Sequence, residues 1–86
     1  MLEYFDRIDE LASQSRKIAD ARACEDMLRF CNSAHEIAVK LSKELVECRR
    51  KNKLSPLSET LLKQLDESVE HIEKMLIFAK IKYPMK

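Results

Sequence analysis

Apolar residues recur at steps of three and four through the middle of the chain. From residue 24 to residue 48 this spacing is uninterrupted and runs through Cys24, Met27, Cys31, Ala34, Ala38, Leu41, Leu45 and Cys48. It places the side chains on one stripe of an α-helix, as at the a and d positions of a coiled coil. Phe30 and Ile37 widen the stripe on one side. We therefore predict a long amphipathic helix over residues 21–51.

A second long helix is predicted over residues 56–82. Its apolar seam runs through Leu61, Leu65, Ile72, Met75 and Ala79, with Leu62, Val69 and Leu76 beside it. Ser55 is a good N-cap and Pro56 suits the first helical position. Asn52 is the best available C-cap for the preceding helix, because asparagine tolerates the left-handed conformation. The two helices should therefore form an antiparallel hairpin with a short connection.

The position of the turn predicts the register of this hairpin. If the chain folds about Leu54, Ala34 lies opposite Met75 and Cys31 lies opposite Phe78. Small residues then face large ones, as close packing of helix surfaces requires.

The segment before residue 20 has an apolar stripe of its own. It runs through Tyr4, Ile8, Leu11, Ser15 and Ile18. Its phase does not continue into the stripe that begins at Cys24, and Asp20 is a suitable N-cap for a new helix. We predict a separate helix over residues 2–19. One continuous helix from Leu2 to Lys51 is the alternative, because no helix-breaking residue stands between the two segments.

The 86 residues contain no glycine. Glycine is the usual residue of tight turns and of phosphate-binding loops, so its absence argues against hairpin-rich sheets and against nucleotide-binding folds. The length fits a single helical domain over residues 1–86. The predicted fold class is all-α: an antiparallel, coiled-coil-like helical hairpin plus an N-terminal helix, in a three-helix or dimeric bundle.

Composition excludes several classes of protein. Apolar residues make up 45% of the chain, charged residues 36%, and the net charge is +1. A net charge this small provides no global attraction to nucleic acid or to anionic membranes. No apolar run approaches the roughly 18–20 residues that span a bilayer, and the first residues lack the basic start of a secretory signal. We expect a cytoplasmic protein without membrane insertion.

The cysteines are odd in number: Cys24, Cys31 and Cys48. On one helix Cys24 and Cys31 lie about 10 Å apart, whereas a disulfide needs Cα atoms within about 7 Å. All three are predicted to be reduced and buried. No Cys-x-x-Cys motif is present and no histidine stands at ligand spacing from a cysteine pair, so we expect neither a metal nor another cofactor.

Histidine chemistry is one alternative function. His35 and His71 should lie at similar heights on the hairpin but on opposite flanks, and neither has the Glu-x-x-His spacing of carboxylate-bridged metal bundles. The stretch Ala34-His35-Glu36-Ile37 resembles the phosphoacceptor segment of histidine kinase dimerisation domains, which also pair helical hairpins. The sequence Ala38-Val39-Lys40 stands where that family has a basic, small-residue and proline pattern. The resemblance implies a phosphotransfer-like module with His35 as its acceptor.

The remaining polar residues predict no enzyme and no small-molecule substrate. Acids on the last helix have bases at helical spacing, as in Glu70 and Lys74, which is typical of a solvated face. A second alternative function is a nucleic-acid-binding helical regulator, because the concentrated positive charge lies at the hairpin tip, on Arg49, Arg50, Lys51 and Lys53. No aromatic residue interleaves these cations for base stacking, which argues against nucleic acid as the partner.

The two seams are flanked by more apolar side chains than the hairpin and one short helix can bury. We expect the surplus to form a protein-interaction surface that includes Ile37, Leu62, Val69, Leu76 and Phe78. The expected partner is a second copy of the chain (a homodimer) or another helical protein. The predicted function is therefore a small helical protein–protein interaction module of the adaptor, co-chaperone or regulator type. Its size and layout are similar, in a general way, to small bacterial secretion co-chaperones and to phage or plasmid helical regulators.

Overall fold

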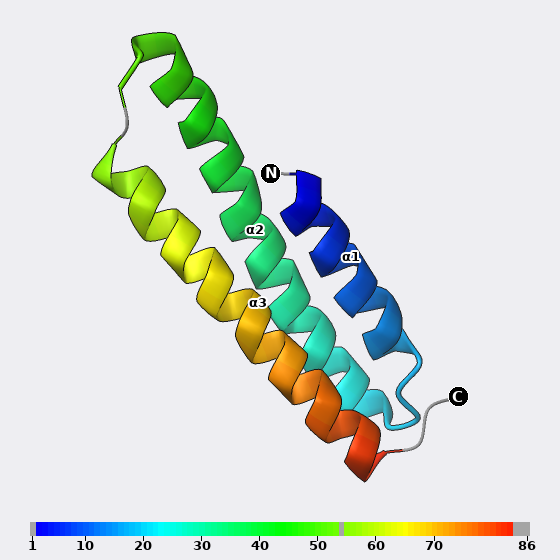
Figure 1. Ribbon diagram of the computed structural model, residues 1–86. Helices are drawn as coiled ribbons and strands as arrows, with labels where there is room; N and C mark the ends of the chain where they lie inside the picture. Colours follow the sequence, from blue (N-terminus) through cyan, green and yellow to red (C-terminus); the bar gives the residue numbers. More distant parts are fainter. Residues whose placement is uncertain (1, 54, 84–86) are drawn as a thin grey trace.

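The computed structural model describes residues 2–53 and 55–83, and in this part of the chain the structure consists of three helices without strands. These are α1 (Leu2–Arg16), α2 (Ala21–Lys51) and α3 (Pro56–Lys82). Helices α2 and α3 form a long antiparallel hairpin, and α1 lies beside the half of the hairpin remote from its tip (Figure 1). The molecule is an elongated bundle of 49 × 17 × 16 Å. The predicted all-α fold class, a hairpin plus an N-terminal helix, is confirmed.

Helix α1 ends earlier than the predicted residue 19, and the alternative of one continuous helix is wrong. The reason is the cap of α2: Asp20 has an extended backbone (φ −83°, ψ 118°), and its carboxylate accepts a hydrogen bond from the Ala23 N–H at 2.8 Å. This cap satisfies an amide that would otherwise lack a partner at the helix start. The connection also turns Ile18 inward, where the side chain is 1% exposed.

The hairpin turn uses the residues that the sequence indicates. Asn52 adopts the left-handed conformation (φ 54°, ψ 43°), and the Lys53 N–H donates to the Cys48 carbonyl at 2.9 Å. Ser55 caps α3 by accepting from the Ser58 N–H at 3.2 Å, and Pro56 opens the helix. Asparagine adopts the left-handed conformation at a lower energetic cost than most residues other than glycine, so it can take the place of glycine at this cap.

The register of the hairpin differs from the prediction by about one helical turn. Met75 lines a hollow with Arg29, Phe30 and Ser33, residues that precede Ala34 in α2. Phe78 lines a hollow with Asp26 and Met27, which lie about one turn before Cys31 in α2. The chain leaves α2 at its C-cap Asn52, and Leu54, the predicted centre of the turn, lies outside the described part of the chain.

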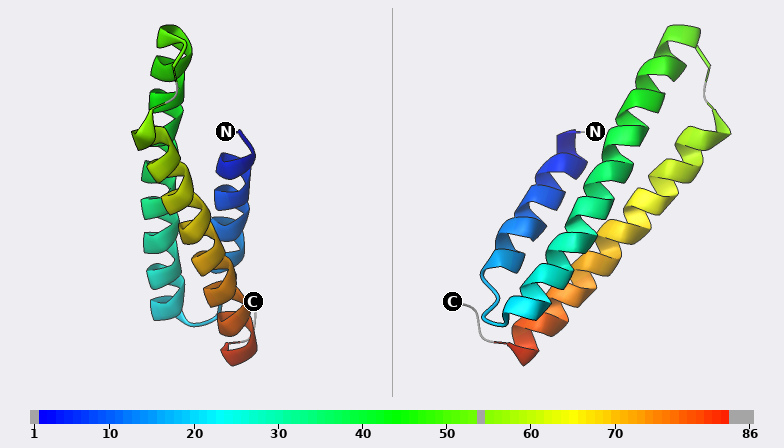
Figure 2. Two further views of the ribbon diagram at one scale, coloured as in Figure 1. Left: turned by 60° about the vertical axis from the view of Figure 1, so that its left-hand side comes forward. Right: turned by 180° about the vertical axis from the view of Figure 1, so that it is seen from behind.

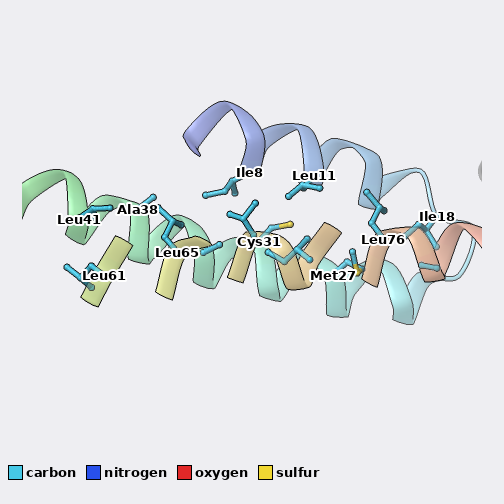
Figure 3. Close-up of a cluster of buried hydrophobic side chains, with 14 residues drawn as sticks. Ile8, Leu11, Ile18, Met27, Cys31, Ala38, Leu41, Leu61, Leu65 and Leu76 are labelled. Carbon is cyan, nitrogen blue, oxygen red and sulfur yellow. The ribbon is translucent and has the colours of Figure 1, made fainter. Parts of the chain in front are cut away.

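The core contains side chains from every helix. Its buried members are Ile8, Leu11, Ile18, Met27, Cys31, Ala34, Ala38, Leu41, Leu61, Leu65, Val69, Ile72, Leu76 and Ala79. Figure 3 shows Ile8 and Leu11 of α1 lying over the hairpin side chains, Cys31 among them. The completely buried alanines of α2, Ala34 and Ala38, allow the two long helices to approach closely.

Polar contacts align α1 along one edge of α3. The Tyr4 hydroxyl donates to Asp66, Arg7 forms an ion pair with Glu73, and Lys80 donates to Gln14. Asp66, Glu73 and Lys80 are seven residues apart, so they form one row along α3. On α2, the ring of His35 packs edge-to-face on Phe5 of α1, with the ring centroids 5.3 Å apart. These contacts lie on the side of the hairpin that α1 covers, where Ile8 and Leu11 join the core.

Two predicted surface residues are core residues as a result. Val69 is 0% exposed and Leu76 is 4% exposed, so the prediction that they belong to an interaction surface is wrong. Both lie on the side of α3 that α1 occupies, and they complete the core between the three helices. The opposite face of the hairpin is left without a third helix, as the view in Figure 2 (left) shows.

Candidate functional site

The uncovered face of the hairpin is hollowed between α2 and α3. Its central hollow has a volume of about 380 Å³, and is lined by Phe30, Ser33, Ile37, Gln64, Glu67, Ser68, His71 and Ile72. No residue of α1 is among these. Phe30 and Ile37 lie on the side of the buried α2 stripe away from His35, which α1 contacts.

This hollow continues toward the end of α3. The next hollow shares Phe30 and Ser33 with the first and adds Asp26, Arg29 and Met75. A third shares Asp26 and Met75 with the second, and is lined by Ala23, Asp26, Met27, Met75, Phe78, Ala79, Lys82 and Tyr83. The shared residues make the three hollows one continuous groove along the hairpin. We call it the open groove.

The walls of the open groove are largely apolar. Phe30 is 43% exposed and Phe78 is 70% exposed, while Ile37 and Met75 are half-buried. Phe30 packs edge-to-face on His71, with the ring centroids 5.5 Å apart and an interplanar angle of 74°. This contact between α2 and α3 holds both rings in the groove wall.

Regular spacing explains why these side chains meet. On α2, Ala23, Phe30 and Ile37 recur every seven residues, one position before the members of the buried stripe. On α3, Ser68 and Met75 are also seven residues apart. In a supercoiled pair such rows remain on one flank along the whole contact. The groove is therefore bordered by one such row from each helix.

The predicted interaction residues have different locations. Ile37 and Phe78 line the open groove, and Leu62 is 41% exposed on α3 outside its lining. Val69 and Leu76 are buried, as described above. Phe30, Met75 and His71 are not in the predicted set. The seven-residue row through Phe30 and Ile37 marks a flank of the α2 stripe, but it does not show whether another helix covers that flank.

His35, the predicted phosphoacceptor, is exposed on the α1 side of the hairpin. Its edge-to-face contact with Phe5 accounts for its position without any chemical role. His71 of α3 lines the open groove. The groove is on the face of the hairpin away from α1, so the two histidines do not share a site. In the described residues no group of three histidine, cysteine or acidic side chains is arranged to hold a metal ion.

All three cysteines are free. Cys31 and Cys48 are buried, but Cys24 is only half-buried, so the prediction of three buried thiols is wrong for Cys24. Cys24 lies in the first turn of α2, at the end of the bundle, where fewer side chains cover it. Burial raises the pKa of the Cys31 thiol, an effect that the Ser15 hydroxyl and the Arg16 charge partly oppose. A thiol with a raised pKa is a poor nucleophile at neutral pH.

The basic residues of the tip, Arg49, Arg50, Lys51 and Lys53, are exposed. They are accompanied by acids: Glu47 pairs with Arg50 at 3.5 Å, and Glu44 accepts a hydrogen bond from Ser55 at 2.7 Å. Arg49, Arg50 and Lys51 lie in the last turn of α2, where positive charge complements the helix dipole. The tip is therefore a mixed-charge surface.

Comparison of the chain with protein-family models, with curated proteins and with solved structures finds no match. None of the helices in the described residues is long and apolar enough to cross a membrane.

Proposed function

We propose that this protein is a helical protein–protein interaction module that binds an amphipathic helix in its open groove. The observation that supports the proposal is the exposure of Phe30 and Phe78 in a continuous apolar groove between two helices. A helix placed there would bury these rings and convert the two-helix face into a bundle. Helix-in-groove binding of this kind relies on apolar anchors at helical spacing.

Aromatic side chains are the expected energetic centre of such an interface. Rings such as Phe30 and Phe78 bury large areas, and burial of apolar surface contributes roughly 25 cal/mol per Å². The edge-to-face contact with His71 holds the Phe30 ring in place before the partner binds. A side chain that is already ordered loses less conformational entropy on association.

Site-specific photo-crosslinking in the native host tests the proposal. Benzoylphenylalanine in place of Phe78 reports on the groove, and the same residue in place of Val46 is the matched control, because Val46 is 61% exposed outside the groove lining. We expect a crosslinked protein adduct from position 78 and none from position 46. The adduct should disappear when Phe30→Glu is added to the Phe78 reporter. Equal adducts from both positions, or no adduct from position 78, would contradict the proposal.

A further inference from the structure

Charges beside the open groove are arranged with reversed sign about Ser33. On α2, Asp26 and Lys40 each lie seven residues from Ser33, on opposite sides of it. Because the spacing is seven, all three side chains lie in one row at the groove edge. In the adjacent row, Arg29 lies four residues before Ser33 and Glu36 lies three residues after it. Each charge thus has an opposite charge at the mirrored position or one residue from it.

Helix α3 repeats this arrangement at the same height. His71 and Ser33 line the same hollow, so they lie at about the same level of the hairpin. Glu67 lies four residues before His71 and Lys74 lies three residues after it. The acid and the base therefore again lie on opposite sides of the centre, at nearly equal distances.

The apolar side chains are compatible with the same centre. Phe30 and Ile37 lie three residues before and four residues after Ser33, and both line the central hollow. Ser33 itself is small and exposed. A small residue between two large ones allows close approach of another helix at that point.

We infer that the amphipathic helical partner of the open groove is a second copy of this chain, whose own groove face covers it, antiparallel about a two-fold axis beside Ser33 and His71, so that α2 faces α2 and α3 faces α3. In this arrangement Asp26 faces Lys40 of the second copy, Arg29 faces Glu36, and Glu67 faces Lys74. Phe30 meets Ile37 at the centre. A two-fold interface requires a surface that is complementary to itself, and the charges of this surface meet that requirement.

The intrahelical ion pairs do not compete strongly with this assembly. Arg29 pairs with Glu25 at 3.1 Å and Lys74 with Glu70 at 3.1 Å, but all four side chains are well exposed. Exposed pairs of this kind contribute little, so their side chains are available to a facing copy.

Charge reversal combined with mixing tests the inference, which rests on the proposed function. Sedimentation equilibrium of the full chain at micromolar concentration should give a dimer, twice the 10.1 kDa of one chain. Asp26→Lys alone, or Lys40→Asp alone, should raise the dimer dissociation constant on the order of tenfold, because each places like charges opposite each other twice. The double variant Asp26→Lys/Lys40→Asp should have the dissociation constant of the unmodified chain, because opposite charges again face each other.

Mixing the two single variants provides the sharpest readout. In a mixed dimer a lysine of one copy meets an aspartate of the other at both ends, so an equimolar mixture should associate as tightly as the unmodified chain. Helical circular dichroism should be unchanged throughout, because positions 26 and 40 are exposed. A dimer dissociation constant that neither charge reversal changes would overturn the antiparallel arrangement. An equimolar mixture of the single variants that associates no more tightly than either variant alone would also overturn it.

The two proposals can fail separately. A monomer that crosslinks to another protein through position 78 would overturn the self-association and leave the groove function in place. A monomer that yields no adduct from position 78 would overturn both.

Discussion

Cys24 and Cys31 lie two turns apart on the same helix, but their thiols have different surroundings. Cys31 is 2% exposed, and burial raises the pKa of its thiol. Cys24 is half-buried at the start of α2. We expect Cys24 to react with a thiol reagent at about pH 8 on the order of tenfold faster than Cys31 or Cys48 in the folded chain. Mass spectrometry of the labelled peptides measures this, and equal rates for the three thiols would contradict the described burial.

At the same scale, Leu76 and Ile77 are neighbours of similar size with opposite exposure. Leu76 is 4% exposed in the core, and Ile77 is 61% exposed on the surface. Leu76→Ala should lower the free energy of unfolding by about 2–5 kcal/mol, because it removes buried methyl groups and leaves a cavity. Ile77→Ala should change it by no more than about 0.5 kcal/mol. Urea denaturation compares them directly, and similar midpoints would place Leu76 at the surface as the sequence pattern alone suggested.

At the scale of the elements, the end of α2 depends on one residue in an unusual conformation. Asn52 is the residue with positive φ in the described chain, at 54°. Asn52→Ala should destabilise the protein by about 1 kcal/mol, because a β-carbon is unfavourable in the left-handed region, while Asn52→Gly should cause no loss. Thermal unfolding should show a decrease of roughly 4–8 °C for the alanine variant.

Asn32 is the matched control for this prediction, because it is an exposed asparagine within the regular part of α2. Asn32→Ala should be neutral or slightly stabilising, since alanine has the higher helix propensity. If both alanine variants melted at the same temperature, the backbone of Asn52 would not account for the cap.

At the scale of the whole molecule, the attachment of α1 should depend on pH. The hydrogen bond from the Tyr4 hydroxyl to Asp66 is the main cause that raises the pKa of Tyr4, with burial adding to it. An unfolded tyrosine ionises near pH 10. The stabilisation from this contact is therefore complete below about pH 10, and is lost as the pH rises through the raised pKa of the folded state.

Urea unfolding of the intact chain and of Tyr4→Phe tests this dependence. At pH 7 the variant should be less stable by about 1 kcal/mol, the usual net contribution of a hydrogen bond. Above pH 10 the difference should shrink, because the intact chain alone loses the contact. A constant difference across this range would show that the hydroxyl does not link α1 to α3.

The local features of this fold follow from residues close together in the chain. The caps at Asp20, Asn52 and Ser55 involve partners within a few residues, and the uninterrupted three-four spacing from Cys24 to Cys48 determines one long amphipathic helix. Propensity, capping and periodicity act over a turn or two, so sequence reasoning recovers the three helices and their antiparallel hairpin.

The tertiary structure alone decided which flank of the hairpin is covered. Val69 and Leu76 flank one side of the α3 seam as Phe30 and Ile37 flank the α2 stripe, and neither pair carries a local signal that separates core from surface. Helix α1 covers the flank of Val69 and Leu76, with which Ile8 and Leu11 share the core. Its contacts with α3 join distant residues, as between Tyr4 and Asp66, which are 62 positions apart. Such contacts form only when packing brings distant segments together, and covering one flank necessarily leaves the other as the open groove.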